Sequence, residues 1–263
     1  MIDVAPYLRR IGHDGPVHPR VEVLRALHLA HLCTVPFENL DIHLGRPIVL
    51  CEEAQLRKVV RERRGGFCYE LNGAFATLLL ALGFRVSLLS AGAMGADGRF
   101  GPPFDHLLLE VHCPDGSAGS AGWLADVGFG EGFLEPLRFE VGEEQPQGNG
   151  VYRLDRDGDD YVLLRRTEPD GPLDPQYRFT AEPRELTDFA EMCRHHQTSP
   201  ESHFTRQRVC SLATPEGRVT LTEGRLIVTR RGERTELPIQ DDAAYRAALR
   251  ERFGIELVGD WVR

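Results

Sequence analysis

A cysteine, a histidine and an aspartate occur in sequence settings that suit nucleophilic catalysis. Cys68 lies in "RRGGFCYELNG", where a glycine pair precedes a helical pattern of apolar residues that ends at Gly83. The free N–H groups and the positive dipole end at a helix start favour a thiolate. The apolar spacing places Cys68 on the buried face of this helix, which also fits a small hydrophobic core residue.

His106 and Asp126 are candidates for a base and its orienting carboxylate. His106 begins the predicted strand "DHLLLEVHC", and alternation places it on the same face as Leu108. Asp126 lies between apolar neighbours in "WLADVGFG", where a buried carboxylate needs a partner such as a histidine N–H. Cys68, His106 and Asp126 thus form a possible triad of nucleophile, base and carboxylate. An ordinary structural role stays open for His106, one of ten histidines.

Four residues near the C-terminal third could suggest a zinc site. They are Cys193, His195, His196 and His203. Their spacing matches no standard structural zinc site, and adjacent histidines point in different directions on a helix or strand. We therefore predict no metal.

The elements that must position these residues follow an α+β order. Helical periodicity covers "VEVLRALHLAHLCTV", "CEEAQLRKVVRER" and the segment that starts at Cys68. Strand patterns then dominate, with a hairpin turn at Asp157-Gly158 and a further helix over 183–195. The strands are predicted at 84–90, 105–113, 137–141, 151–157, 160–166, 206–212, 217–222, 225–231 and 233–238. A terminal helix is predicted at about 241–253.

Composition excludes several classes of protein. The 263 residues include 41% hydrophobic and 27% charged residues, as expected of a globular protein. A formal net charge of −9 argues against nucleic-acid binding, which needs a clustered basic face. No signal peptide is visible, and the longest apolar stretch is too short to span a bilayer. We expect a cytoplasmic protein without membrane partners, and its six cysteines as thiols.

Taken in order, four motifs carry a family resemblance. "VPFENL", "RGGFCYELNG", "FDHLLL" and "WLADVGFG" are similar to those of the arylamine N-acetyltransferases, and "TSPESHF....VCS" resembles a later block of that family. The resemblance covers most of the chain. It implies an N-terminal helical bundle (1–84), a central β-barrel (85–182) and a C-terminal α/β lid (183–263). It also implies a Cys-His-Asp core like that of cysteine proteases and transglutaminases.

The resemblance implies a ping-pong reaction with acetyl-CoA as co-substrate. The cysteine is acetylated first, and the acetyl group then passes to an arylamine or arylhydrazine. The triad carries over onto Cys68, His106 and Asp126, each at its motif position. Aromatic residues of the motifs carry over as walls of the substrate pocket; they are Phe37, Tyr69, Phe129, His203 and Phe204.

Further expectations concern the surroundings of the nucleophile, the first from the resemblance and the others from backbone chemistry. Glu38 and Arg64 would lie beside the nucleophile, where a partly buried ion pair could lock the glycine hinge; otherwise both are solvated charges. Gly128 and Gly130 could approach the phosphates of CoA through backbone N–H groups. The Cys68 N–H is a candidate oxyanion donor.

Other functions remain open. One is a thiol hydrolase or transglutaminase-like enzyme, and another is a related acyltransferase that makes an amide in biosynthesis, such as a macrolactam. A binding protein on an inactive enzyme scaffold is the alternative outside catalysis. The natural acceptor, the preferred acyl-CoA and the oligomeric state cannot be read from the sequence.

Overall fold

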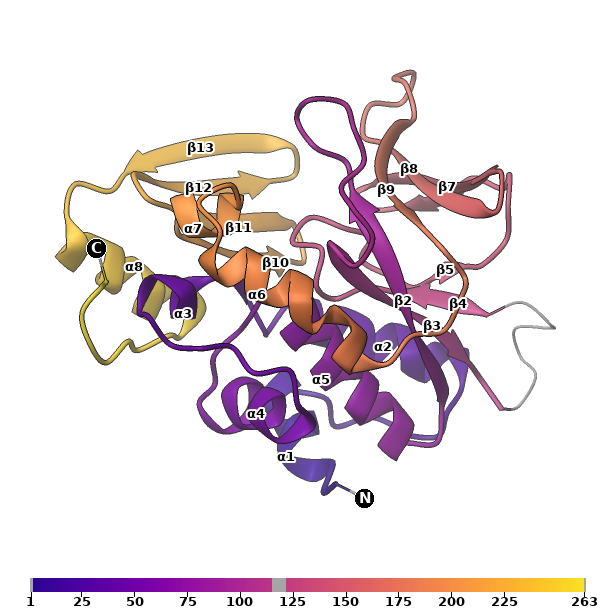
Figure 1. Cartoon of the computed structure of the whole chain (residues 1–263), viewed down its shortest axis with the longest axis horizontal. Coiled ribbons are helices and arrows are strands. Elements are labelled where there is room, and N and C mark those ends of the chain that lie inside the picture. Colours follow the sequence, from indigo (N-terminus) through magenta and orange to yellow (C-terminus); the bar gives the residue numbers. More distant parts are fainter. Residues whose placement is uncertain (1, 115–121, 263) are drawn as a thin grey trace.

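The computed structural model of this chain describes residues 2–114 and 122–262 (Figure 1). Helices make up most of the first part of the chain, and two antiparallel sheets follow. This mixture agrees with the predicted α+β class. Within the described ranges, no helix has the length and apolar character needed to cross a membrane.

The N-terminal helices surround α5, the helix that begins at Cys68. The side chains of Leu71, Phe75 and Leu78 are fully buried, as the predicted apolar spacing requires. Gly83, at a φ of +92°, takes the left-handed conformation that ends the helix. The bounds are α1 (Ala5–Ile11), α2 (Val21–Leu32), α3 (Leu40–His43), α4 (Glu52–Leu56), the π-helical turn η1 (Arg57–Arg61) and α5 (Cys68–Ala81).

The central sheet has eight strands in the order β5-β4-β3-β2-β9-β8-β7-β6 and is nearly closed. Apolar side chains, among them Leu108, Tyr152 and Tyr177, fill its interior. The strands are β2 (Arg85–Ala93), β3 (His106–His112), β4 (Trp123–Ala125), β5 (Leu137–Arg138), β6 (Gln145–Gln147), β7 (Gly150–Asp157), β8 (Asp160–Arg166) and β9 (Asp174–Phe179).

A glutamine side chain bridges the two edges of this barrel-like sheet. The backbone N–H of Arg138 in β5 donates to Gln145 Oε1 at 2.7 Å, and Gln145 Nε2 donates to the Arg138 carbonyl at 3.0 Å. The amide thus makes the two hydrogen bonds that a neighbouring strand would make. The edges are satisfied although β5 and β6 do not pair as strands.

Strand β3 joins the barrel to the helices. Leu107, Leu109 and Val111 pack into the helical core, whereas Leu108 packs into the barrel interior. His106 shares the barrel face, because its ring lies 5.2 Å from the Phe129 ring and 5.3 Å from the Tyr177 ring, measured between centroids. The predicted alternation along this strand is confirmed.

A second sheet of five strands has the order β1-β10-β11-β12-β13. Its first strand, β1 (Phe37–Glu38), comes from the N-terminal part and pairs antiparallel with β10. Helix α8 packs on this sheet through Tyr245 and Leu249, at the yellow end of the chain in Figure 1. The other elements are η2 (Leu186–Phe189), α6 (Ala190–Thr198), α7 (His203–Arg206), β10 (Val209–Thr214), β11 (Gly217–Thr222), β12 (Arg225–Arg230), β13 (Glu233–Pro238) and α8 (Asp242–Phe253).

Some predicted bounds need correction. The helix predicted over 183–195 is a 3₁₀ turn followed by α6, because the Asp188 carboxylate caps the Glu185 N–H and starts a tight turn there. The strand predicted over 137–141 has two residues; the Phe139 N–H makes one more bond in the same register, to the carbonyl of Gly122, which lies just before β4. The Asp157-Gly158 hairpin is confirmed. The boundaries predicted after residues 84 and 182 fall in connections, and the domain division itself stays a prediction.

Candidate active site

Cys68 is the first residue of α5 and is buried, with 3% of its surface exposed. The helix start is held by Glu70, whose Oε2 accepts the Phe67 N–H at 3.2 Å. The turn after β4 packs tightly on it, because a Cβ at Gly128 would lie 2.7 Å from the Cys68 Cα. Only glycine fits at this close approach, so the "DVGFG" turn is shaped to meet the nucleophile.

The glycine pair before Cys68 allows a close approach between two segments of the protein backbone. A Cβ at Gly65 would lie 1.8 Å from the Pro36 carbonyl oxygen, and the Gly66 carbonyl accepts the Glu38 N–H at 2.8 Å. The hinge is therefore pressed against the segment around β1. The close contact belongs to the protein backbone and fixes where α5 begins.

Glu38 and Arg64 form a buried ion pair beside this hinge, as predicted. Arg64 Nη2 lies 2.7 Å from Glu38 Oε1 and 3.1 Å from Asp41 Oδ1. Lys58 Nζ lies 2.8 Å from Asp41 Oδ2 and 2.7 Å from Glu70 Oε1. Burial raises the pKa of Glu70 to about 7, although the Lys58 charge works against that rise. Five charged side chains thus tie the hinge to the first turn of α5.

His106 and Asp126 are hydrogen-bonded to each other. His106 Nε2 lies 2.7 Å from Asp126 Oδ2, and both side chains are buried. Burial opposes ionisation of Asp126. The charge and hydrogen bond of His106, with hydrogen bonds from Asn72 and Gly128, outweigh it and lower the pKa of the carboxyl. A carboxylate only accepts hydrogen bonds, so the Nε2 hydrogen faces Asp126 and Nδ1 is left as the basic nitrogen.

Two residues that sequence reasoning missed hold Asp126 in place. The Asn72 side-chain amide donates to Asp126 Oδ1 at 2.9 Å and accepts the Val127 N–H at 2.9 Å. His28 Nε2 accepts the Asp126 backbone N–H at 3.1 Å, while its Nδ1 bonds to the Leu134 carbonyl at 2.9 Å. Burial lowers the pKa of His28 to about 4. A neutral imidazole can therefore satisfy both partners at neutral pH.

The electrostatics of Cys68 differ from the expected thiolate. Burial raises the pKa of the thiol well above its usual value; the Leu107 backbone N–H lowers it, and the charges of Asp105 and Asp126 raise it further. Burial thus acts against a thiolate at this position, although Cys68 begins a helix. The thiol must lose its proton to a neighbouring base as it reacts.

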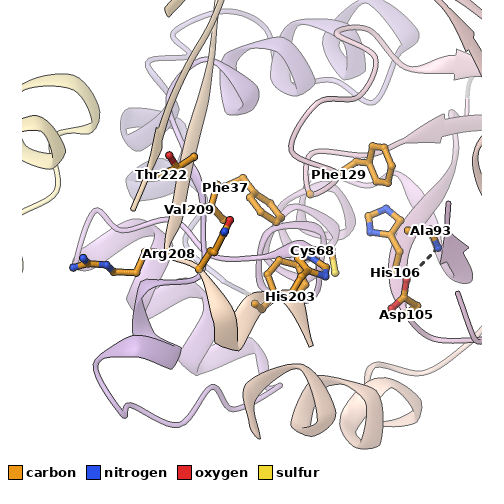
Figure 2. Close-up of a pocket in the computed structure, with 13 residues that line it drawn as sticks. Phe37, Cys68, Ala93, Asp105, His106, Phe129, His203, Arg208, Val209 and Thr222 are labelled. Atoms are coloured by element: carbon orange, nitrogen blue, oxygen red, sulfur yellow. Dashed lines mark hydrogen bonds between the residues drawn. The ribbon is translucent and has the colours of Figure 1, made fainter. Parts of the chain in front are cut away.

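Cys68 and His106 line a common cavity of about 370 Å³ (Figure 2). Four of the five predicted pocket aromatics, Phe37, Phe129, His203 and Phe204, line it as well. Tyr69 lies outside its wall, because it follows Cys68 on the helix and points elsewhere. Its hydroxyl donates to the Phe104 carbonyl at 2.7 Å and the Asp105 carbonyl at 3.1 Å. The cavity is also lined by Ala93, Asp105, Gly128, Gln207, Arg208, Val209 and Thr222.

Gly128 and Gly130, the two residues predicted to contact the CoA phosphates, differ in their surroundings. The Gly128 N–H donates to Asp126 Oδ1 at 3.0 Å and is thus already engaged. Gly130, at a φ of +83°, lies next to the Phe37 ring at the cavity. A contact of this turn with CoA remains a prediction, and Gly130 is the better placed of the two.

Asp105, which sequence reasoning also missed, is the cavity's carboxylate. His196 Nε2 lies 3.1 Å from Asp105 Oδ1, and His196 Nδ1 lies 3.2 Å from Ser202 Oγ. His196, one of the considered zinc ligands, thus has two polar neighbours. Across the described part of the chain, no three His, Cys, Asp or Glu side chains are grouped so as to hold a metal ion.

Comparisons with known proteins agree with this arrangement. A model of the N-acetyltransferase family matches residues 20–262. An arylamine N-acetyltransferase of Mycolicibacterium smegmatis is 38% identical over 97% of this chain and 93% of its own length. That of Escherichia coli K12 is 35% identical over 95% of this chain and 87% of its own. The solved structure of Mycobacterium marinum arylamine N-acetyltransferase in complex with CoA has a TM-score of 0.88 at 34% identity, and covers 96% of this chain and 93% of its own.

The family model and the relatives, together with the fold, place the chain among the N-acetyltransferase enzymes. The named relatives, which match the chain over nearly its full length, define its family more narrowly than the family model does. The chain belongs to the arylamine N-acetyltransferase family.

Proposed function

We propose that this enzyme transfers an acetyl group from acetyl-CoA to the nitrogen of an arylamine or arylhydrazine, through a thioester on Cys68. The observation that carries the proposal is the His106–Asp126 hydrogen bond at 2.7 Å in the cavity that Cys68 also lines. The relatives that share this fold are arylamine N-acetyltransferases, one of them solved in complex with CoA.

In the first half-reaction, Cys68 attacks the thioester carbonyl of acetyl-CoA. His106 Nδ1 takes the thiol proton as the new carbon–sulfur bond forms, so a free thiolate need not accumulate at this buried site. The bond from the acetyl carbon to the CoA sulfur then breaks, and the proton passes from His106 to the departing CoA thiolate. The products are acetyl-Cys68 and CoA.

In the second half-reaction, the amine nitrogen attacks the acetyl-Cys68 carbonyl. His106 accepts the amine proton, the bond to the Cys68 sulfur breaks, and the proton returns to that sulfur. Asp126 stabilises the imidazolium in both steps and holds Nε2 away from the reacting atoms. The exchange of one thioester for another is nearly balanced in energy, which suits a reversible first step.

The developing oxyanion needs N–H donors. The Cys68 N–H lies at the first position of α5, where the N–H has no acceptor within the helix. We propose it as one oxyanion donor, in line with the preorganised dipoles that lower such barriers.

Finer features of the fold and location belong to the same proposal. We infer a three-part organisation with a Cys-His-Asp core of the cysteine-protease and transglutaminase type. The barrel-like sheet and the separate sheet with α8 support it. A cytoplasmic location remains an expectation from the sequence.

Steady-state kinetics test the proposed function against its alternatives. With acetyl-CoA and an arylamine both varied, parallel double-reciprocal lines and stoichiometric N-acetylated product are expected. A thiol hydrolase would release CoA continuously without acceptor. A transglutaminase-like enzyme would show no dependence on acetyl-CoA, and either result would overturn the proposal.

A further inference from the structure

Asp105 places a negative charge in the wall of the cavity, next to the nucleophile. Of the described residues that line this cavity, it is the one carboxylate. Its charge raises the pKa of the Cys68 thiol, as the charge of Asp126 also does, and thus acts against a thiolate. Figure 2 shows it beside His106, at the start of β3.

The backbone that carries Asp105 is fixed from several sides. Phe104, directly before it, has a φ of +66°, a conformation that a bulky residue adopts only when its surroundings impose it. The Tyr69 hydroxyl donates to the Phe104 and Asp105 carbonyls, and the Phe104 N–H donates to Ser90 Oγ at 2.7 Å. These contacts account for the buried Tyr69 hydroxyl and set where the carboxylate lies.

The carboxylate itself is held as an anion. Asp105 Oδ2 accepts the Ala93 N–H at 3.1 Å, and Oδ1 faces His196 Nε2. The His196 imidazole lies between the two groups, with Nε2 3.1 Å from Asp105 Oδ1 and Nδ1 3.2 Å from Ser202 Oγ. Burial opposes ionisation, but the contacts with His196 and Ala93 outweigh it and lower the pKa of the carboxyl.

The cavity's permanent cation does not offset this charge. Arg208 is paired with Glu223 and lies 3.4 Å from Asp242 Oδ1. Its guanidinium group lies over the Tyr245 ring, and in Figure 2 it points away from Cys68 and His106. Arg208 is the one Arg or Lys among the described residues that line the cavity, so no guanidinium or ammonium group of this lining is paired with Asp105.

We propose that Asp105 is a specificity-determining residue that disfavours acceptors carrying a carboxylate relative to neutral aromatic amines. This inference rests on the proposed acetyl transfer. Two like charges a few ångströms apart in a partly buried site repel strongly enough to lower kcat/KM for an anionic acceptor by about 10- to 50-fold. A neutral acceptor of the same shape meets no such repulsion.

Two probes of nearly equal shape isolate this effect. 4-Aminobenzoate is anionic at pH 8, and 4-aminobenzamide is neutral. The measured quantity is kcat/KM for the benzoate divided by kcat/KM for the benzamide. Comparing this ratio in each variant with that of the parent cancels the different reactivity of the two amines. Asp105→Asn should raise the ratio of benzoate to benzamide about 10- to 50-fold, and any change in the reactivity of Cys68 affects both probes and cancels in the ratio. His196→Gln disturbs the same contact but keeps the carboxylate, so its ratio should stay near the parent value.

An unchanged ratio in folded Asp105→Asn would overturn the inference, as would an equal rise in His196→Gln, which would point to packing in place of charge. Asp105→Thr gives the same readout should the asparagine variant fail to fold. The proposed function fails separately, if the parent acetylates neither probe. If the parent acetylates the benzamide but Asp105→Asn leaves the ratio unchanged, only the role of Asp105 is refuted.

Discussion

The substitution Asp126→Asn replaces one carboxylate oxygen by an NH₂ group. The hydrogen-bond partners of both oxygens are known from the structure. Oδ1 of Asp126 accepts two N–H groups, from Asn72 at 2.9 Å and Gly128 at 3.0 Å, and Oδ2 faces His106. The asparagine carbonyl should face the two donors, because the reverse orientation would leave two buried N–H groups unpaired at about 1–3 kcal/mol each. Its NH₂ group then faces His106 Nε2.

Two N–H groups cannot bond to each other, so His106 must change tautomer in this variant. The proton moves to Nδ1, and the nitrogen that should accept the thiol proton is occupied. We expect the rate of acetyl transfer to fall by roughly 10²–10⁴-fold, the scale of general acid–base catalysis, toward the upper end because the histidine has the wrong tautomer.

Rapid-mixing measurement of CoA release gives the acetylation rate, and ¹⁵N NMR of the histidine ring gives the tautomer. Asp97→Asn, which removes an exposed carboxylate, is the matched control and should behave as the parent. A folded Asp126→Asn enzyme that keeps the Nε2–H tautomer and a rate near that of the parent would refute the reasoning.

Three further outcomes are expected. In His106→Gln, alkylation of Cys68 by iodoacetamide should have its midpoint above the free-thiol value of about 8.5, because burial remains and the base is gone; a midpoint at or below that value would contradict this. The folded pKa of Glu70, about 7, exceeds the unfolded value of about 4.3, so ionised Glu70 costs folding free energy at pH 8, and this cost falls as the pH falls to 5. Denaturant unfolding should show the parent gaining stability over Glu70→Gln across that range, and the opposite slope would be incompatible with a raised pKa. Gly65→Ala should prevent correct folding, judged by circular dichroism, because its Cβ would overlap the Pro36 carbonyl; a native-like spectrum and Tm would disprove this.

Local sequence patterns predicted the elements that carry the candidate site. The apolar spacing after Cys68 gave α5 and its end at Gly83, and alternation after His106 gave the two faces of β3. These features depend on neighbours within one helix or strand. The pairing of Glu38 with Arg64 was also reached, through the family motifs that contain them.

Contacts between distant segments could not be read in this way. His28 looks like one more residue of an amphipathic helix, and its partner, the Asp126 N–H, is 98 positions away. Asp105 directly precedes His106 in the "FDHLLL" motif, and His196, which lies 3.1 Å from it, is 91 positions further along the chain. A carboxylate directly before a candidate base was the one available signal.

The ionisation of Cys68 also depends on contacts with segments that are distant in the sequence. The helix start, which is local, favours a thiolate, but the desolvation that raises the thiol pKa comes from packing by β3 and the turn at Gly128. Burial depends on the whole fold, so a local pattern could not predict whether the pKa of the Cys68 thiol is raised or lowered.

The central claim is the covalent step on Cys68. The most direct measurement is intact-mass and peptide mass spectrometry of the enzyme after incubation with acetyl-CoA and no acceptor. We predict one acetyl group per chain, located on Cys68, absent from Cys68→Ala and lost when an arylamine is added. An acetyl group on another residue, or an unmodified enzyme that still acetylates arylamines when both substrates are present, would contradict the account.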